Sequence, residues 1–278
     1  MDEVLPENVP VRFAATVMLI DDRPDLQVFM MERNAKTVFA GGMWVFPGGA
    51  VDDTDQPELF ESISIHRSDL DASKLLGLDH GGLSFYVAAI REAFEEAGIL
   101  LALHKDDHRN LEISNDQDKA RYAIYRDQVN TDSEAFIKLI EKEQLILDVK
   151  QMHYVARWIT PEGPPRRFDA RFFISRMPSF QTPVHDNSEL VHSAWFSPKE
   201  ILEKFDQGEM VLMSPTLRMV RNLAKFTSAD EAIKAAAQNM PSERARVNHK
   251  REIILPGDEG YEHGEENAEF GWVSLRPS

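Results

Sequence analysis

Apolar positions in this chain follow two repeating patterns, and the first is typical of strands. Residues 11–20 are apolar with β-branched side chains, and residues 26–32 follow them after the turn-like DDRPD, so the two segments predict a pair of strands. Residues 152–159 and 167–176 predict a second pair, which TPEGPP separates. Residues 192–196 predict a further strand.

The second pattern has the spacing of helices. Residues 89–101 are the clearest example, and residues 117–144 predict two more helices in succession. Ser197 and the proline that follows it predict a helix N-terminus, because serine caps helices and proline suits their first position. We expect further helices at residues 216–226 and 229–239.

The helix predicted at residues 89–101 has one apolar face and one acidic face. Glu92, Glu95 and Glu96 are at positions i, i+3 and i+4, so their carboxylates share a face. Like charges at this spacing repel, which favours a bound cation between them. Oxygen ligands without cysteine or histidine suit Mg²⁺ or Mn²⁺ better than zinc. Gly98 is placed to end the helix, because glycine tolerates the left-handed conformation.

Composition and charge narrow the possible functions. The 278 residues are 42% hydrophobic and 28% charged, which is typical of a globular protein. The net charge of −16 argues against general binding to nucleic acid or to anionic membranes. An anionic substrate then needs a bound metal ion or a local basic patch.

The absence of cysteine excludes zinc–thiolate sites, disulfides and thiol nucleophiles. The N-terminus lacks the pattern of a signal peptide, and no apolar run approaches the roughly 18 residues of a membrane span. We therefore expect a cytoplasmic protein.

The order Arg-Glu-Ala-Phe-Glu-Glu-Ala-Gly-Ile at residues 91–99 resembles the second half of the Nudix box, and Pro47-Gly48-Gly49 resembles its entry. In that family the opening glycine lies fourteen residues before the arginine, whereas Gly49 and Arg91 are 42 positions apart. The first glutamate of the box falls on Asp55 counted forward from Gly49, and on Leu83 counted back from Arg91. We interpret residues 52–82 as a polar surface-loop insertion that splits the box while its halves meet in space.

The resemblance extends over residues 11–261 and is to the branch of Nudix hydrolases that includes the animal peroxisomal coenzyme A diphosphatase. It implies an α/β fold with a mixed β-sheet between helices. The implied organisation is one domain with two insertions and an extension, at residues 1–278 (domain), 10–226 (core), 52–82 and 105–148 (insertions) and 227–278 (C-terminal extension).

The same resemblance implies a metal-dependent hydrolysis of a diphosphate. The expected reaction converts coenzyme A or acyl-coenzyme A to 3′-phospho-AMP and (acyl-)4′-phosphopantetheine. The glutamates of the box would hold Mg²⁺ or Mn²⁺ with the carbonyl of Gly49, and Arg91 would orient a neighbouring glutamate. One of the box glutamates or Glu189 would act as general base.

Arginine residues are the candidates for binding substrate phosphates, because the guanidinium fork matches phosphate oxygens. Arg33 keeps the spacing of a coenzyme A signature found upstream of the box in other Nudix enzymes. Three further candidates lie close together in an otherwise acidic chain, where pairing with the many acids is an equally good explanation: Arg166, Arg167 and Arg171.

Two alternatives to coenzyme A hydrolysis stay open. One is a diphosphatase for ADP-ribose or NADH, and the other is a Nudix-like module that binds a ligand without catalysis. Homodimerisation through the extra helices is also possible.

Overall fold

A nine-stranded mixed sheet forms the centre of the computed structural model, which describes residues 9–37, 40–162, 164–184, 190–238, 242–249, 253–266 and 271–277. Its strands lie side by side in the order β10 (Leu190–Phe196), β2 (Leu26–Arg33), β1 (Val11–Asp22), β9 (Arg167–Arg176), β8 (His153–Ile159), β15 (Gly271–Val273) and β11 (Glu243–Arg244). Two short strands add to it, β3 (Trp44–Val45) on β2 and β4 (Gly48–Ala50) on β1.

The long strand β1 organises this sheet. It runs parallel to β9 along residues 11–20, while its other edge is divided between β4 beside residues 14–16 and β2 beside residues 20–22. Its side chains are buried on both faces of the sheet from Val17 to Ile20, which explains the continuous apolar run in the sequence. Both predicted strand pairs, β1 with β2 and β8 with β9, are confirmed.

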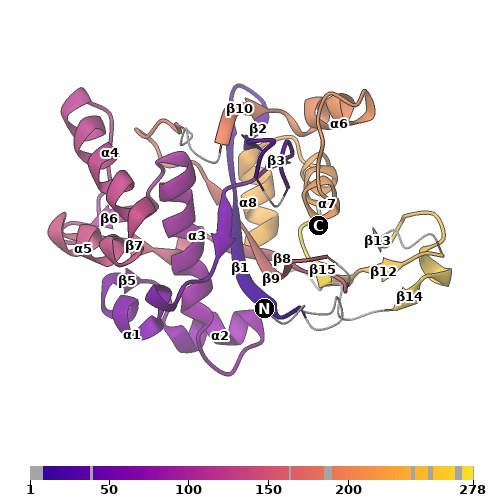
Figure 1. The fold of residues 1–278 in the computed structure, drawn as a ribbon, viewed down its shortest axis with the longest axis horizontal. Coiled ribbons are helices and arrows are strands. Elements are labelled where there is room, and N and C mark those ends of the chain that lie inside the picture. Colours follow the sequence, from indigo (N-terminus) through magenta and orange to yellow (C-terminus); the bar gives the residue numbers. More distant parts are fainter. Residues whose placement is uncertain are drawn as a thin grey trace.

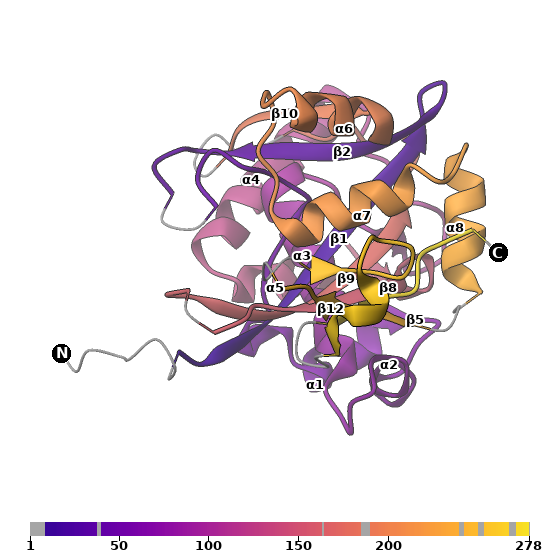
Figure 2. The same cartoon turned by 90° about the vertical axis from the view of Figure 1, so that its right-hand side faces the viewer.

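Helices cover both faces of the sheet (Figure 1), so two hydrophobic cores form. On one side lie α3 (Gly82–Ala97), α1 (Pro57–Phe60), α2 (Asp69–Leu76), α4 (Asp116–Thr131) and α5 (Glu134–Lys142). On the other side lie α6 (Pro198–Asp206), α7 (Ser214–Leu223) and α8 (Ala229–Ala237). Figure 2 shows α7 crossing the face of the sheet.

The helix ends follow the local sequence. Gly98 has φ 68° and its N–H donates to the carbonyl of Phe94, as expected for a left-handed C-cap. The hydroxyl of Ser197 accepts from the N–H of Glu200, so the predicted start of α6 is confirmed. Helix α3 begins at Gly82, seven residues before the predicted start.

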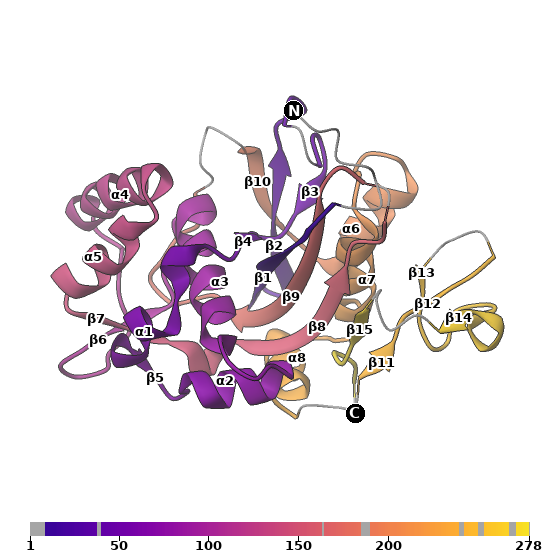
Figure 3. The same ribbon diagram turned by 60° about the horizontal axis from the view of Figure 1, so that its bottom comes forward.

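Residues 52–82 differ from the surface loop that the sequence suggested. They contain α1, α2 and the strand β5 (Ser64–Ile65), and they bury Phe60 and Ile63 in the core beneath α3. Strand β5 pairs with β7 (Leu145–Asp148), which also pairs with β6 (Ala102–His104) in a separate three-stranded sheet. The two insertions are therefore packed together on the α3 side (Figure 3). Short 3₁₀ turns complete the elements at Asp53–Asp55, Glu61–Ile63, Val149–Gln151 and Tyr261–His263.

The C-terminal extension contributes to the central sheet. Strand β15 lies between β8 and β11, and Trp272 is in register with Arg157 of β8. A second small sheet projects from this end of the molecule (Figure 1) and consists of β12 (Arg246–Val247), β13 (Ile253–Ile254) and β14 (Glu265–Glu266). Among the described residues, no helix combines the length and the apolar character that a bilayer-spanning segment requires.

Because β15 completes the sheet, truncating Val273 should destabilise the whole fold. Val273 is 1% exposed, and Val273→Ala should lower the free energy of unfolding by about 2 kcal/mol. Val211 is 50% exposed, so Val211→Ala, which removes the same atoms, should change it by less than about 0.5 kcal/mol. Urea denaturation measures both, and equal effects would contradict the structural role of β15.

Candidate active site

The glutamates of α3 lie against the glycines of β4. The N–H of Gly48 donates to Oε2 of Glu96 at 2.8 Å. Gly49 is so close to Glu92 that a Cβ atom on it would lie 2.3 Å from Oε1. Only glycine fits this close approach, and both carboxylate side chains are 13% exposed. The two halves of the split motif therefore meet, as the sequence predicted.

The guanidinium of Arg91 lies beneath this cluster and is 3% exposed. Its Nη1 donates to Glu92 at 3.1 Å and to Glu95 at 3.0 Å. Its other face donates from Nε and Nη2 to the two carboxylate oxygens of Asp55, at 2.9 and 3.0 Å. Nη2 also donates to the carbonyl of Ala50, the last residue of β4. The guanidinium of Arg91 thus joins α3 to β4 and to the turn that carries Asp55.

Asp55 is the residue whose role the sequence left open. Its side chain is buried to 1% exposure and makes the two-pronged pair with Arg91. Counting forward from Gly49 had placed the first acidic position of the box at Asp55, and its acidic character was the signal for this role. The pair is thus formed although Asp55 lies within residues 52–82, the predicted insertion.

Burial and crowding alter the protonation of these groups. Burial raises the pKa of Glu92 well above its usual value, and the charges of Glu96 and Glu95 add to this, although Arg91 opposes it. Burial also raises the pKa values of Glu95 and Asp55, in each case against the influence of Arg91. Burial opposes the charge on Arg91, but its acidic partners outweigh that effect and raise its pKa, so it stays a cation.

These pKa shifts arise first from burial and only then from repulsion between the carboxylates, and a divalent cation would favour their charged forms. The donors are carboxylate oxygens beside the backbone of Gly49, and this chemistry fits Mg²⁺ or Mn²⁺. Within the described part of the chain, no three acidic or histidine side chains are arranged so as to hold a metal ion together. Glu92 and Glu95 each direct one oxygen to Arg91 instead.

Arg33 is the predicted phosphate ligand that lies at the cluster. Its Nη1 is 3.8 Å from Oε1 of Glu96, and its side chain is 18% exposed. It is the last residue of β2, which pairs with β3, the short strand that precedes β4 in the sequence. A second cation therefore lies at the edge of the acidic face.

Arg166 and Arg167 lie farther away. Arg167 is in register with Val11 of β1, four residues before the position of β1 that pairs with Gly49, which is roughly 13 Å along the strand. Arg166 is exposed, and the Nε of Arg167 donates to the carbonyl of Thr160. Arg167 is the first residue of β9 and Arg166 precedes that strand, so both lie away from the cluster.

The prediction that Arg171 binds phosphate is corrected by its position. Its side chain is 1% exposed and pairs with Asp169, with 2.6 Å between Nη1 and Oδ1. Its guanidinium lies over the rings of Phe13 and Phe85, so it is a buried part of the contact between β9 and α3. A substrate phosphate does not reach it in this structure. Glu189, the proposed general base, lies outside the described residues.

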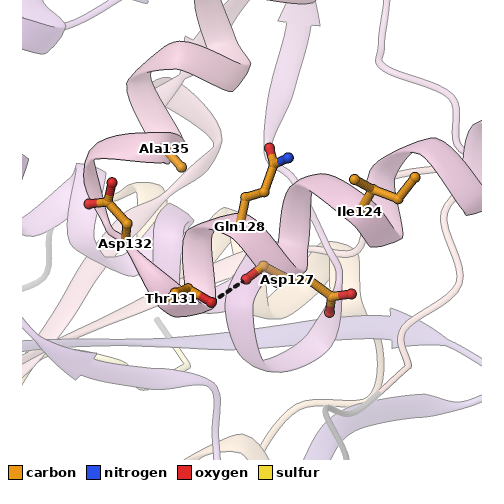
Figure 4. Close-up of a pocket in the computed structure, with 6 residues that line it drawn as sticks. All are labelled: Ile124, Asp127, Gln128, Thr131, Asp132 and Ala135. Carbon is orange, nitrogen blue, oxygen red and sulfur yellow. Dashed lines mark hydrogen bonds between the residues drawn. The ribbon is translucent and has the colours of Figure 1, made fainter.

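A surface depression lies elsewhere in the described part of the chain. It has a volume of about 470 Å³ and lies on α4 and the start of α5 (Figure 4). Its lining contains no residue of the acidic cluster: Ile124, Asp127, Gln128, Thr131, Asp132 and Ala135. The cluster, rather than this depression, has the chemistry that the sequence predicted.

Comparison with known proteins identifies the family of this chain and its fold. Residues 70–223, more than half of the chain, match the model of the NUDT19 Nudix domain. The chain belongs to this Nudix family. A crystal structure of a Nudix hydrolase from Alicyclobacillus acidocaldarius has a TM-score of 0.67 and 25% identity, covering 81% of this chain and 96% of its own. The predicted α/β Nudix fold is thereby confirmed.

Two relatives are similar to this chain at about one quarter sequence identity. The acyl-coenzyme A diphosphatase NUDT19 of Xenopus laevis is 27% identical over 235 residues, which cover 74% of this Nudix chain and 62% of the relative. The protein of the same name from Gallus gallus is 26% identical over 303 residues, which cover 90% of this chain and 79% of that one. The match thus spans less than two thirds of the Xenopus protein.

The Asp55–Arg91 pair should be essential for stability. Asp55→Ala leaves the buried guanidinium short of one partner, and we expect a loss of about 3 kcal/mol in the free energy of unfolding. Asp53 is an exposed neighbour, so Asp53→Ala should have little effect. Urea denaturation compares the two variants. Unchanged stability of Asp55→Ala would show that Glu92 and Glu95 suffice as partners of Arg91.

Proposed function

We propose that this chain is a metal-dependent diphosphatase that hydrolyses coenzyme A or acyl-coenzyme A to 3′-phospho-AMP and (acyl-)4′-phosphopantetheine. The observation that carries the proposal is the contact of Glu92 and Glu96 with β4, joined through Arg91 to Asp55. A split motif whose parts reassemble around a buried ion pair is expected of a working site. The acyl-coenzyme A diphosphatases among the relatives support the substrate class.

The glutamates and the glycine carbonyl would hold the metal ion. Glu92, Glu95 and Glu96 would supply carboxylate oxygens, and Gly49 its carbonyl, for Mg²⁺ or Mn²⁺. When bound, such an ion neutralises charge on the diphosphate and lowers the pKa of bound water. The raised pKa values of Glu92 and Glu95 support this role, because a bound cation would favour their charged forms.

The remaining roles divide between positioning and binding. Arg91 is too buried to meet substrate, so it holds Glu92 and Glu95 in place. Arg33 lies where a diphosphate beside the glutamates would come within its reach. The general base would be a box glutamate or Glu189. Arg166 and Arg167 would bind a phosphate of the substrate that lies farther from the glutamates. The cytoplasmic location and the homodimer stay predictions.

Substrate identity is tested by incubation with Mg²⁺ or Mn²⁺ and a panel of coenzyme A, acetyl-coenzyme A, dephospho-coenzyme A, ADP-ribose and NADH. We expect mass spectrometry to detect 3′-phospho-AMP from coenzyme A, and chelation to stop its release. Equal turnover of dephospho-coenzyme A, which lacks the 3′-phosphate, would refute the coenzyme A assignment. Cleavage of ADP-ribose or NADH alone would retain a diphosphatase with another substrate, and no cleavage would favour a non-catalytic module.

The role of the carboxylates is tested by Glu95→Gln, which keeps the size of the side chain and removes its charge. Even residues that only hydrogen-bond a metal ligand contribute about 10- to 100-fold, so we expect kcat to fall by at least about 100-fold. Glu134→Gln, at a 66% exposed glutamate of α5, is the matched control and should keep full activity. Undiminished activity of Glu95→Gln would refute the metal site.

A further inference from the structure

The second insertion reaches the C-terminal end of the glutamate helix through one side chain. The last carbonyls of a helix lack partners within it. Arg126 of α4 donates from Nε to the carbonyl of Glu95 at 2.7 Å and from Nη2 to the carbonyl of Glu96 at 2.6 Å. The two carbonyls belong to residues whose carboxylates form the cluster.

The third nitrogen of Arg126 fixes a neighbouring segment. Nη1 donates to the carbonyl of Val184 at 2.7 Å, and the N–H of Val184 donates to the carbonyl of Ala97 at 2.9 Å. The buried amide of Gln181 bonds to both the N–H and the carbonyl of Leu100, each at 3.0 Å. Residues 181–184 are thus tied to the end of α3, and Arg126 bonds to both.

The opposite end of α3 is held by the first insertion. The carboxylate of Asp69 accepts from the N–H groups of Gly81 and Leu83, at 3.0 and 2.9 Å. The hydroxyl of Ser73 accepts from the N–H of Gly82 at 2.8 Å. These contacts lie about nine residues or more before Glu92, whereas those of Arg126 lie within the cluster itself. Helix α3 therefore has hydrogen bonds to other segments at both ends. Of these two sets, only the hydrogen bonds of Arg126 involve the glutamates.

We propose that Arg126 is a positioning residue for the carboxylates of Glu95 and Glu96. It acts through the peptide groups of these residues and does not touch the substrate. A displacement of a reacting group by about 1 Å costs up to roughly 100-fold in rate, so a hold on these peptides has a catalytic consequence. This role rests on the proposed hydrolysis, and it assigns a function to the second insertion.

A purely structural role for Arg126 predicts that its loss reduces folding, whereas a positioning role predicts that its loss reduces kcat in a folded protein. The contact between Phe94 and Tyr122, with 6.5 Å between ring centroids, already packs α4 on α3. Loss of Arg126 should therefore leave the two helices together. A change in kcat without a matching change in KM separates positioning from simple loss of the fold.

The test compares Arg126→Ala and Arg126→Lys with two controls. Arg121→Ala removes an arginine from the same helix, where its partners are Asp118 and Glu143 of the insertion itself. Asp69→Ala removes the hold on the opposite end of α3. For each variant we would measure the melting temperature, kcat and KM for coenzyme A, and Mn²⁺ affinity by electron paramagnetic resonance.

Arg126→Ala should lower kcat by about tenfold or more and weaken Mn²⁺ binding, while KM changes by less than about threefold. The kcat and the Mn²⁺ affinity of Arg126→Lys should lie between those of Arg126→Ala and the wild type. Lysine keeps the charge but cannot span three carbonyls. Both controls should keep kcat within about twofold at matched folded fraction. If Arg126→Ala does not fold, Arg126→Lys alone decides.

An active wild type whose Arg126 variants keep kcat and Mn²⁺ affinity would overturn the positioning role alone. An equal fall in Asp69→Ala would overturn it too, because the effect would then reflect general loss of helix stability. A wild type that neither binds Mn²⁺ nor hydrolyses the panel would overturn the proposed function and this role with it. A wild type that binds Mn²⁺ without hydrolysis still tests the role through metal affinity.

Discussion

The buried guanidinium of Arg91 is the constraint on which the rest of the site depends. It gathers the carboxylates of Asp55, Glu92 and Glu95 around one cation, at 2.9 to 3.1 Å. Removing water from charged groups is expensive unless partners surround them, and here each group is the partner of another. Together with Glu96, these carboxylates outnumber the single guanidinium of Arg91. The surplus of negative charge faces β4, where a divalent ion would restore balance.

The ion pair between Arg91 and Asp55 joins two parts of the predicted motif that are 36 positions apart in the sequence. The cost of closing a loop rises only slowly with its length, so extra residues after Asp55 add little to it. The insertion also contributes its own buried residues, Phe60 and Ile63, to the core beneath α3. Strand β1 sets the geometry, because it binds β4 along one edge while its buried face supports α3. The glycines of β4 and the glutamates of α3 are therefore in contact although they are far apart in the sequence.

Local features of the fold could be predicted from the sequence, and long-range partners could not. Gly98 and Ser197 marked helix ends because their roles depend on neighbours within four residues. Arg171 was expected at a phosphate and instead pairs inside the sheet, since composition alone does not show which acid an arginine meets. Trp272 joined the central sheet through pairing with a distant strand, which no periodic pattern records. For the site, residue type identified the glutamates, and only the fold showed what holds them.

The position of the glutamates on α3 creates a further electrostatic demand. Glu95 and Glu96 lie in the last turn of α3, at the negative end of its dipole, where an anion costs about 0.3 to 1 kcal/mol, and Glu92 lies one turn earlier. A cation at the terminal carbonyls has the opposite effect, and Arg126 supplies one there. Its hydrogen bonds also satisfy carbonyls that the turn at Gly98 leaves exposed. A helix that concentrates acids at its own C-terminus needs an external cation, and in this chain an inserted helix provides it.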